Sequence, residues 1–178
     1  MLNTACHKML RIAGTVSDSI VDGPGIRYVI FTQGCPHHCP GCHNPQTHDF
    51  DGGIDVDTEK ILEEIFNHPM LSGVTFSGGE PFCQPEGLLP IAEAVKKRGI
   101  HLMIFTGYLL EQLQKMENKA VKRLLELADM IVDGPFLLEK RNLTLSYRGS
   151  ENQRVIDMVK TRKEEKVVLY RSEYEDLF

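Results

Sequence analysis

The sequence lacks any long apolar run. A transmembrane helix needs about 20 consecutive apolar residues, and no such run occurs among the 178 residues, so we predict no membrane span. Residues 1–11 also lack the apolar stretch of a secretory signal peptide. We therefore expect a cytoplasmic protein.

The chain also lacks an excess of basic charge. Its 20 Lys and Arg stand against 25 Asp and Glu, which gives a formal net charge of −5. Proteins that bind nucleic acid usually carry a basic face or stripe. The basic residues here are scattered apart from short groups such as 96–98, so we predict no nucleic-acid partner.

Repeats, low-complexity tracts and obvious linkers are missing as well, which favours a single domain over residues 1–178 with a flexible tail from about 171 to 178. With 42% hydrophobic residues the chain can build a core without disulfides or a structural metal. A metal site in such a chain is more often functional than structural. In a reducing compartment, the five cysteines indicate metal ligation or redox chemistry.

Apolar patterns predict strands that alternate with helices. Strands are expected over 9–16, 27–32, 73–77, 101–105, 130–132 and 167–170, and helices after Asp57, over 85–98, 109–116 and 118–127. Such alternation is typical of βα units and a mainly parallel sheet. A closed eight-fold barrel takes about 250 residues, more than this chain has. We therefore predict an α/β fold that forms an open or partial (β/α) barrel.

Polar loops follow four of the predicted strands. They are the cysteine loop over 34–45, the glycine turn over 78–81, residues 106–107 and Asp133. In α/β sheets and barrels the functional groups lie at the carboxyl ends of the strands. We expect these loops to meet at one edge of the sheet.

The cysteine loop places Cys35, Cys39 and Cys42 within eight residues. Thiolates at this density select zinc, copper(I) or iron–sulfur clusters. A cluster normally takes four cysteines, whereas Cys6 and Cys83 lie elsewhere and form no Cys-x-x-Cys pair. The loop therefore supplies three cysteines where a cluster normally takes four. Either a ligand is missing, or one coordination position is left open for a substrate.

Two other interpretations of this loop stay open at the level of spacing. His37, His38 or His43 could complete a zinc site, which would make the chain a non-catalytic zinc-binding module. The cysteines could also serve as small buried hydrophobes.

The second motif is Ser77-Gly78-Gly79-Glu80-Pro81. Two glycines let the backbone approach a ligand closely, and a carboxylate beside them suits an ammonium group. Gly-Gly is also a common structural turn, so the motif gains weight only from its expected place beside the cysteines.

Together these motifs resemble the radical S-adenosylmethionine superfamily. A closer resemblance, from about Ile20 to about Tyr170, is to the activating proteins of anaerobic (class III) ribonucleoside-triphosphate reductases. It rests on the cysteine loop, the glycine turn and four further segments: 22–27, 106–108, 132–136 and 148–154. Many superfamily members carry an aromatic residue where this chain has Gly41, and the reductase activators resemble this chain in having Pro-Gly there.

The resemblance implies one 4Fe–4S cluster per chain, held by Cys35, Cys39 and Cys42, with S-adenosylmethionine on the fourth iron. The implied cofactor contacts are Gly41, Cys42, His43, Gly78, Gly79, Glu80 and Asp133. Of these, Gly78, Gly79 and Glu80 would meet the amino group, and Asp133 would hold the methionyl end or a nearby cation. No catalytic residues beyond the cluster and cofactor ligands are implied.

The implied activity is reductive cleavage of S-adenosylmethionine, followed by generation of a glycyl radical on the reductase. The implied partners are that reductase and a flavodoxin or ferredoxin as electron donor. Residues 152–154 would shape the site or its docking face. An activase of another glycyl-radical enzyme, of the pyruvate formate-lyase type, is the alternative within the same chemistry.

Overall fold

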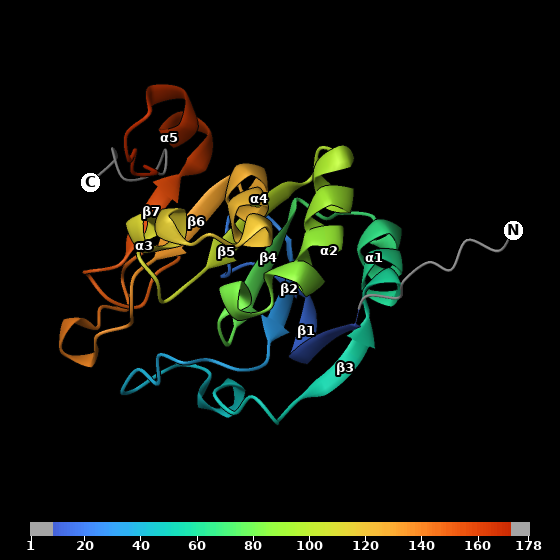
Figure 1. Cartoon of the computed structure of the whole chain (residues 1–178), viewed down its shortest axis with the longest axis horizontal. Coiled ribbons are helices and arrows are strands. Elements are labelled where there is room, and N and C mark those ends of the chain that lie inside the picture. The colour runs from blue at the N-terminus through green and yellow to red at the C-terminus, as the bar shows by residue number, and fades with distance from the viewer. Residues whose placement is uncertain (1–8, 172–178) are drawn as a thin grey trace, which may run out of the picture.

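A seven-stranded mixed sheet forms the centre of the computed structural model, which describes residues 9–171 (Figure 1). The strands are β1 (Met9–Ser19), β2 (Arg27–Thr32), β3 (Ile54–Asp57), β4 (Gly73–Gly78), β5 (His101–Phe105), β6 (Met130–Asp133) and β7 (Arg154–Asp157). They lie in the order β3-β1-β2-β4-β5-β6-β7. The central strands β2, β4, β5 and β6 are parallel, and β1, β3 and β7 are antiparallel to their neighbours. This arrangement confirms an α/β fold with an open sheet and a parallel core.

Helices follow most of the strands. They are α1 (Thr58–Asn67), α2 (Pro85–Lys97), α3 (Leu110–Lys115), α4 (Lys119–Leu127) and α5 (Met158–Glu164), with short 3-10 helices η1 (Pro45–Thr47), η2 (Pro81–Cys83) and η3 (Leu138–Lys140). The starts of α1 and α4 follow from capping. The Asp57 carboxylate accepts the Glu59 N–H, and the Asn118 side-chain oxygen accepts the N–H groups of Ala120 and Val121.

The two faces of the sheet differ because side chains alternate along each strand. On one face, residues such as Ile30, Phe76 and Ile104 pack in the large core beneath the helices, and Figure 1 shows α1, α2 and α4 gathered on that side. Their neighbours Phe31 and Phe105 point to the other face and border a hollow. This face is hollowed beside Phe31 and Phe105, while a smaller buried cluster that includes Met103 and Val132 covers another part of it. The loops after β2 and β6 project beside the sheet.

Arg27 holds together the amino ends of the parallel strands. Its guanidinium is completely buried and donates to Thr75 Oγ1 at 3.0 Å and to the Val74 carbonyl at 2.6 Å. It also contacts His101 Nδ1 at 3.1 Å. Burial lowers the pKa of Arg27 to about 10. This residue of the 22–27 motif thus ties together the starts of β2, β4 and β5.

Three elements were not predicted. Strand β3 has no fully buried side chain, so it shows no hydrophobic pattern, and it forms by pairing with β1. Strand β7 and α5 fall in the stretch after Tyr147 that reads as polar. The prediction of a strand over 167–170 is wrong. The structure has only an isolated antiparallel bridge there, between Leu169 and Ile156.

Most of the predicted tail, residues 172–178, lies outside the described residues. Within residues 9–171, no helix has the length and apolar character needed to cross a bilayer.

Candidate active site

The carboxyl ends of β2, β4 and β5 border an open cavity of about 130 Å³. Its lining is Cys35, His37, Cys39, Cys42, His43, Asn44, His48, Ser77, Gly78, Gly79, Phe105, Thr106, Gly107, Gly134, Phe136 and Gln153. The structure therefore brings together all three cysteines and the glycine turn. Gly41, Glu80 and Asp133 lie beside this lining rather than on it.

Backbone hydrogen bonds shape the cysteine loop. The Gly34 N–H donates to the Thr47 carbonyl at 2.8 Å, and the Cys35 N–H donates to the His48 carbonyl at 3.1 Å. At the far end of the loop, the Cys42 N–H donates to the Cys39 carbonyl at 3.1 Å. Gly41 makes this turn possible because its φ of +73° lies in the left-handed region. The loop is thus held in shape by its own chain.

The thiols have the surroundings of cluster ligands. The Asn44 N–H donates to Cys42 Sγ at 3.4 Å. Burial raises the pKa of the Cys35 thiol, and a hydrogen bond from the His37 backbone works in the opposite direction. Hydrogen bonds to sulfur are among the features that set the properties of iron–sulfur sites. Three cysteines around one cavity, two of them with N–H partners, fit a thiolate-held cluster.

The histidines weighed as zinc ligands have other contacts. His37 Nε2 lies 2.8 Å from Glu80 Oε2, the His43 ring packs edge-on against Phe136, and the His38 ring packs edge-on against His48. Within residues 9–171, no three His, Cys, Asp or Glu side chains converge as the ligands of a single metal ion do. These contacts favour a cluster over a zinc site closed by one of the three histidines.

The glycine turn is fastened to the cysteine loop. The Gly79 N–H donates to the Thr32 carbonyl at 2.8 Å, and the Glu80 N–H donates to the Gly34 carbonyl at 2.8 Å. A Cβ atom on Gly79 would lie 2.4 Å from the Gly34 carbonyl oxygen. Glycine is therefore required at position 79 by close backbone approach, and the turn keeps a backbone surface toward the cavity.

Glu80 lies beneath this turn and is completely buried. Its carboxylate accepts hydrogen bonds from the Phe82 and Gly107 N–H groups, the Thr106 hydroxyl and the His37 ring. A carboxylate offers about four acceptor positions, so these donors use them all. Glu80 thus joins the cysteine loop to the ends of β4 and β5, and its contact with an ammonium group stays a prediction.

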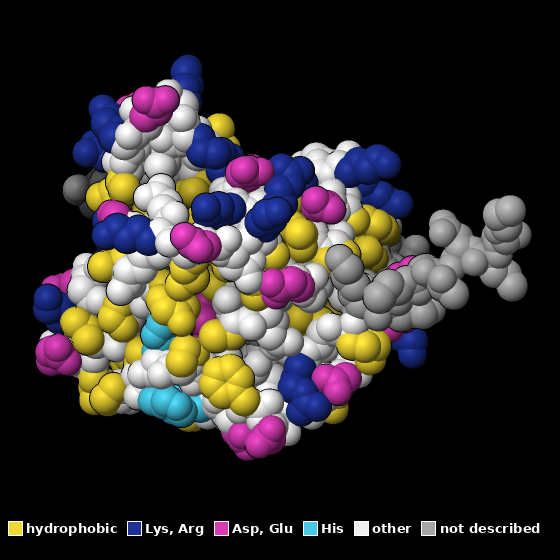
Figure 2. All heavy atoms as spheres, in the orientation of Figure 1, with side chains coloured by type: hydrophobic (Ala, Val, Ile, Leu, Met, Phe, Trp, Pro, Cys, Tyr) yellow, Lys and Arg dark blue, Asp and Glu magenta, His cyan; other side chains and the backbone are white. Residues whose placement is uncertain are grey.

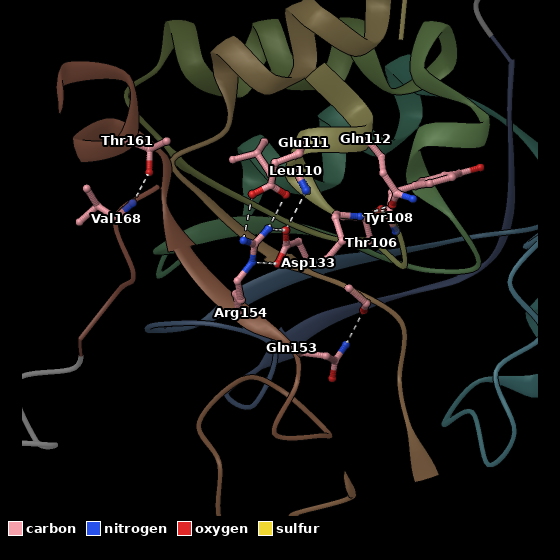
Figure 3. A network of polar contacts seen from close by, with 12 residues as sticks. Thr106, Tyr108, Leu110, Glu111, Gln112, Asp133, Gln153, Arg154, Thr161 and Val168 are labelled. Carbon is pink, nitrogen blue, oxygen red and sulfur yellow. Dashed lines mark hydrogen bonds and ion pairs between the residues drawn. The ribbon is translucent and has the colours of Figure 1, made fainter. Parts of the chain in front are cut away.

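Asp133 has a cation partner within the chain, as Figure 3 shows. Its completely buried carboxylate accepts from Arg154 Nε at 2.9 Å, from Arg154 Nη2 and from the Leu110 N–H. Arg154 also binds Glu111 through two hydrogen bonds. The bonds to Asp133 and then Glu111 raise the pKa of Arg154. Contact between Asp133 and the cofactor likewise stays a prediction.

The positions of Cys83 and His48 relative to the cavity do not follow from any sequence pattern. Cys83 belongs to η2 and does not line the cavity, and burial with the nearby Glu80 charge raises its pKa to about 11. His48 lines the cavity although no spacing or motif singles it out. Cys6 lies outside the described residues.

Comparison with known proteins gives the family. A model described as a 4Fe-4S single cluster domain matches residues 21–156. The anaerobic ribonucleoside-triphosphate reductase-activating protein of Haemophilus influenzae is 32% identical over 142 residues, which cover 75% of this chain and 89% of that protein. The chain belongs to the family of these activating proteins.

Three further proteins are similar to this chain. The protein of the same name from Escherichia coli K12 is 33% identical over 144 residues, covering 75% of this chain and 90% of that protein. The pyruvate formate-lyase-activating enzyme of Clostridium pasteurianum is 44% identical over 106 residues, but this chain covers only 44% of that protein. QueE from Escherichia coli shares the fold, with a TM-score of 0.51, 20% identity and 71% of each chain covered.

Membership in this family confirms the predicted enzyme class and cofactors. The activating protein is a radical S-adenosylmethionine enzyme with a 4Fe–4S cluster. The residues that hold the cluster and the cofactor remain to be tested.

Gly79→Ala tests the close contact between the turn and the cysteine loop. The added methyl group must push the Gly34 carbonyl away, so we expect less iron per chain after anaerobic reconstitution and at least roughly tenfold weaker binding of S-adenosylmethionine. Gly14→Ala is the matched control, because a Cβ there meets no atom within 4 Å. Normal iron content and normal cofactor affinity in Gly79→Ala would contradict the proposed geometry.

Arg154→Ala tests the buried ion pair. It leaves the Asp133 carboxylate buried without its cation, which should lower the free energy of unfolding by roughly 3–5 kcal/mol in urea titrations. Glu111→Gln removes a half-exposed partner of the same arginine and should cost no more than about 1 kcal/mol. Equal losses in the two variants would argue against a structural role for the Asp133–Arg154 pair.

Proposed function

We propose that this chain activates an anaerobic ribonucleoside-triphosphate reductase by generating a glycyl radical on it. One observation carries the proposal: three cysteines and a backbone-lined glycine turn face the same cavity. The extent of the match supports the choice of partner, since the chain covers 89% of the Haemophilus influenzae activating protein.

Within this site, we assign the cluster to Cys35, Cys39 and Cys42. The backbone of Gly78 and Gly79 would meet the amino group of S-adenosylmethionine, with Gly41, Cys42 and His43 against the rest of the cofactor. The assignment is supported by the shared cavity and by the N–H donors beside Cys35 and Cys42. Glu80 would contact the same amino group and Asp133 the methionyl end, and both also hold the surrounding loops in place.

When bound, the cluster and S-adenosylmethionine supply one-electron cleavage to methionine and a 5′-deoxyadenosyl radical, which can take a Cα hydrogen from a glycine. The chain's own task is to bind both and to leave the site accessible to a partner. A second hollow of about 560 Å³ shares His43, Ser77 and Phe105 with the cavity. It gives a segment of another protein room to approach.

The surface around this region suits contact with another protein. Figure 2 shows hydrophobic side chains and histidines together at the lower left, where Figure 1 places the loops after β2 and β6, while Lys and Arg gather toward the top.

We propose a flavodoxin or ferredoxin as the external electron donor, because the cluster must be reduced before it can act.

Activation of a pyruvate formate-lyase is the second candidate. It is favoured by 44% identity to the Clostridium pasteurianum enzyme over 106 residues. Against it, this chain covers only 44% of that enzyme.

The ligand assignment predicts the behaviour of four alanine variants. Replacing Cys35, Cys39 or Cys42 should abolish both cluster binding and 5′-deoxyadenosine formation, because two thiolates do not hold the cluster. Cys83→Ala is the matched control and should keep both, since Cys83 does not line the cavity. Iron content, sulfide content and chromatography of the products measure these outcomes. Loss of the cluster in Cys83→Ala would mean that Cys83 is a fourth ligand, so that no iron is left open for S-adenosylmethionine.

The choice of partner is tested by mixing. With reductant and S-adenosylmethionine, the reconstituted protein should produce a glycyl-radical signal in electron paramagnetic resonance when an anaerobic ribonucleoside-triphosphate reductase is added. A pyruvate formate-lyase should give little signal under the same conditions. A strong signal only with the lyase would reverse the assignment.

A further inference from the structure

His48 is held directly beside the cysteine loop. It caps η1, where its N–H donates to the Pro45 carbonyl at 3.3 Å. Its carbonyl accepts the Cys35 N–H at 3.1 Å, and the preceding Thr47 carbonyl accepts the Gly34 N–H. These bonds fix the backbone of His48 opposite Cys35. The imidazole packs edge-on against the His38 ring, with 5.0 Å between centroids.

The imidazole of His48 has a buried nitrogen that lacks a protein partner. Among the described residues, Nε2 is one of only two buried side-chain nitrogen or oxygen atoms without a hydrogen bond. Leaving such an atom unpaired costs roughly 1–3 kcal/mol, and native structures rarely do so. His48 lines the same cavity as Cys35, Cys39 and Cys42. A ligand that fills this cavity is therefore the group placed to supply the missing partner.

We infer that His48 Nε2–H donates a hydrogen bond to a sulfur of the bound cluster, either a cysteine thiolate or an inorganic sulfide. This inference rests on the proposed function, since it needs the cluster in this cavity. A cluster held by Cys35 would bring sulfur acceptors to the side of His48, because the Cys35 N–H is bonded to the His48 carbonyl. His48 is then a positioning and tuning residue, not an iron ligand.

A hydrogen bond of this kind affects the reduction potential. Reduction adds negative charge to the cluster, and a donor to sulfur stabilises the reduced form more than the oxidised form. Removing the donor should therefore make the cluster harder to reduce.

The test is a redox titration of the reconstituted full chain, followed by electron paramagnetic resonance in the absence of S-adenosylmethionine. At the potential where half of the wild-type cluster is reduced, the ratio of reduced to oxidised cluster in His48→Phe should fall by roughly tenfold. His48→Gln keeps an N–H donor and should recover much of the wild-type ratio. His48→Leu is a smaller variant without a donor and serves if the phenyl ring is not accommodated.

His68→Phe is the matched control. It makes the same replacement at a histidine that caps α1, bonds to Asp18 and does not line the cavity. Its midpoint potential should equal that of the wild type.

Three outcomes would overturn the inference. They are an unchanged potential in His48→Phe and His48→Leu, an unchanged potential with weaker binding of S-adenosylmethionine, and a wild-type spectrum with the strong nitrogen coupling of an iron-bound imidazole. Failure of the proposed function is a separate result, because it would appear as a wild-type protein that binds no cluster.

Discussion

The parallel pairing of β2 with β4 is the constraint on which the site depends. In this register Thr32, the last residue of β2, pairs with Gly78, the last residue of β4. The cysteine loop and the glycine turn therefore leave the sheet side by side. Hydrogen bonds from Gly79 to Thr32 and from Glu80 to Gly34 continue that pairing beyond the strands. A cluster on one loop and the amino acid end of a cofactor on the other would consequently be neighbours.

Buried carboxylates hold the remaining loops around this pair. Glu80 joins the cysteine loop, η2 and the end of β5, and Asp133 joins the end of β6 to β7 and α3 through Arg154. An unpaired buried charge is costly, so each carboxylate is surrounded by donors from several segments. Both carboxylates are satisfied internally and hold together the loops at the edge of the cavity.

Much of this site could be predicted from the sequence because its chemistry restricts residue types. Three thiolates at Cys35, Cys39 and Cys42 and the glycine pair at 78–79 are recognisable without coordinates, and β5 has the bounds that its apolar pattern predicts. Partners far apart in the chain could not be predicted. Thr106 reaches Glu80 across 26 residues and Arg154 reaches Asp133 across 21, and neither pairing leaves a local pattern. His48 carries no spacing signal at all, and only its place opposite Cys35 reveals it.

The central claim is that the protein leaves one iron of the cluster for S-adenosylmethionine. The most direct measurement is electron–nuclear double resonance of the reduced, reconstituted protein with S-adenosylmethionine labelled with ¹⁵N at its amino group. The account predicts a strong ¹⁵N coupling, because that nitrogen would bind iron directly. The absence of this coupling, together with a fourth ligand supplied by a side chain of the protein, would contradict it.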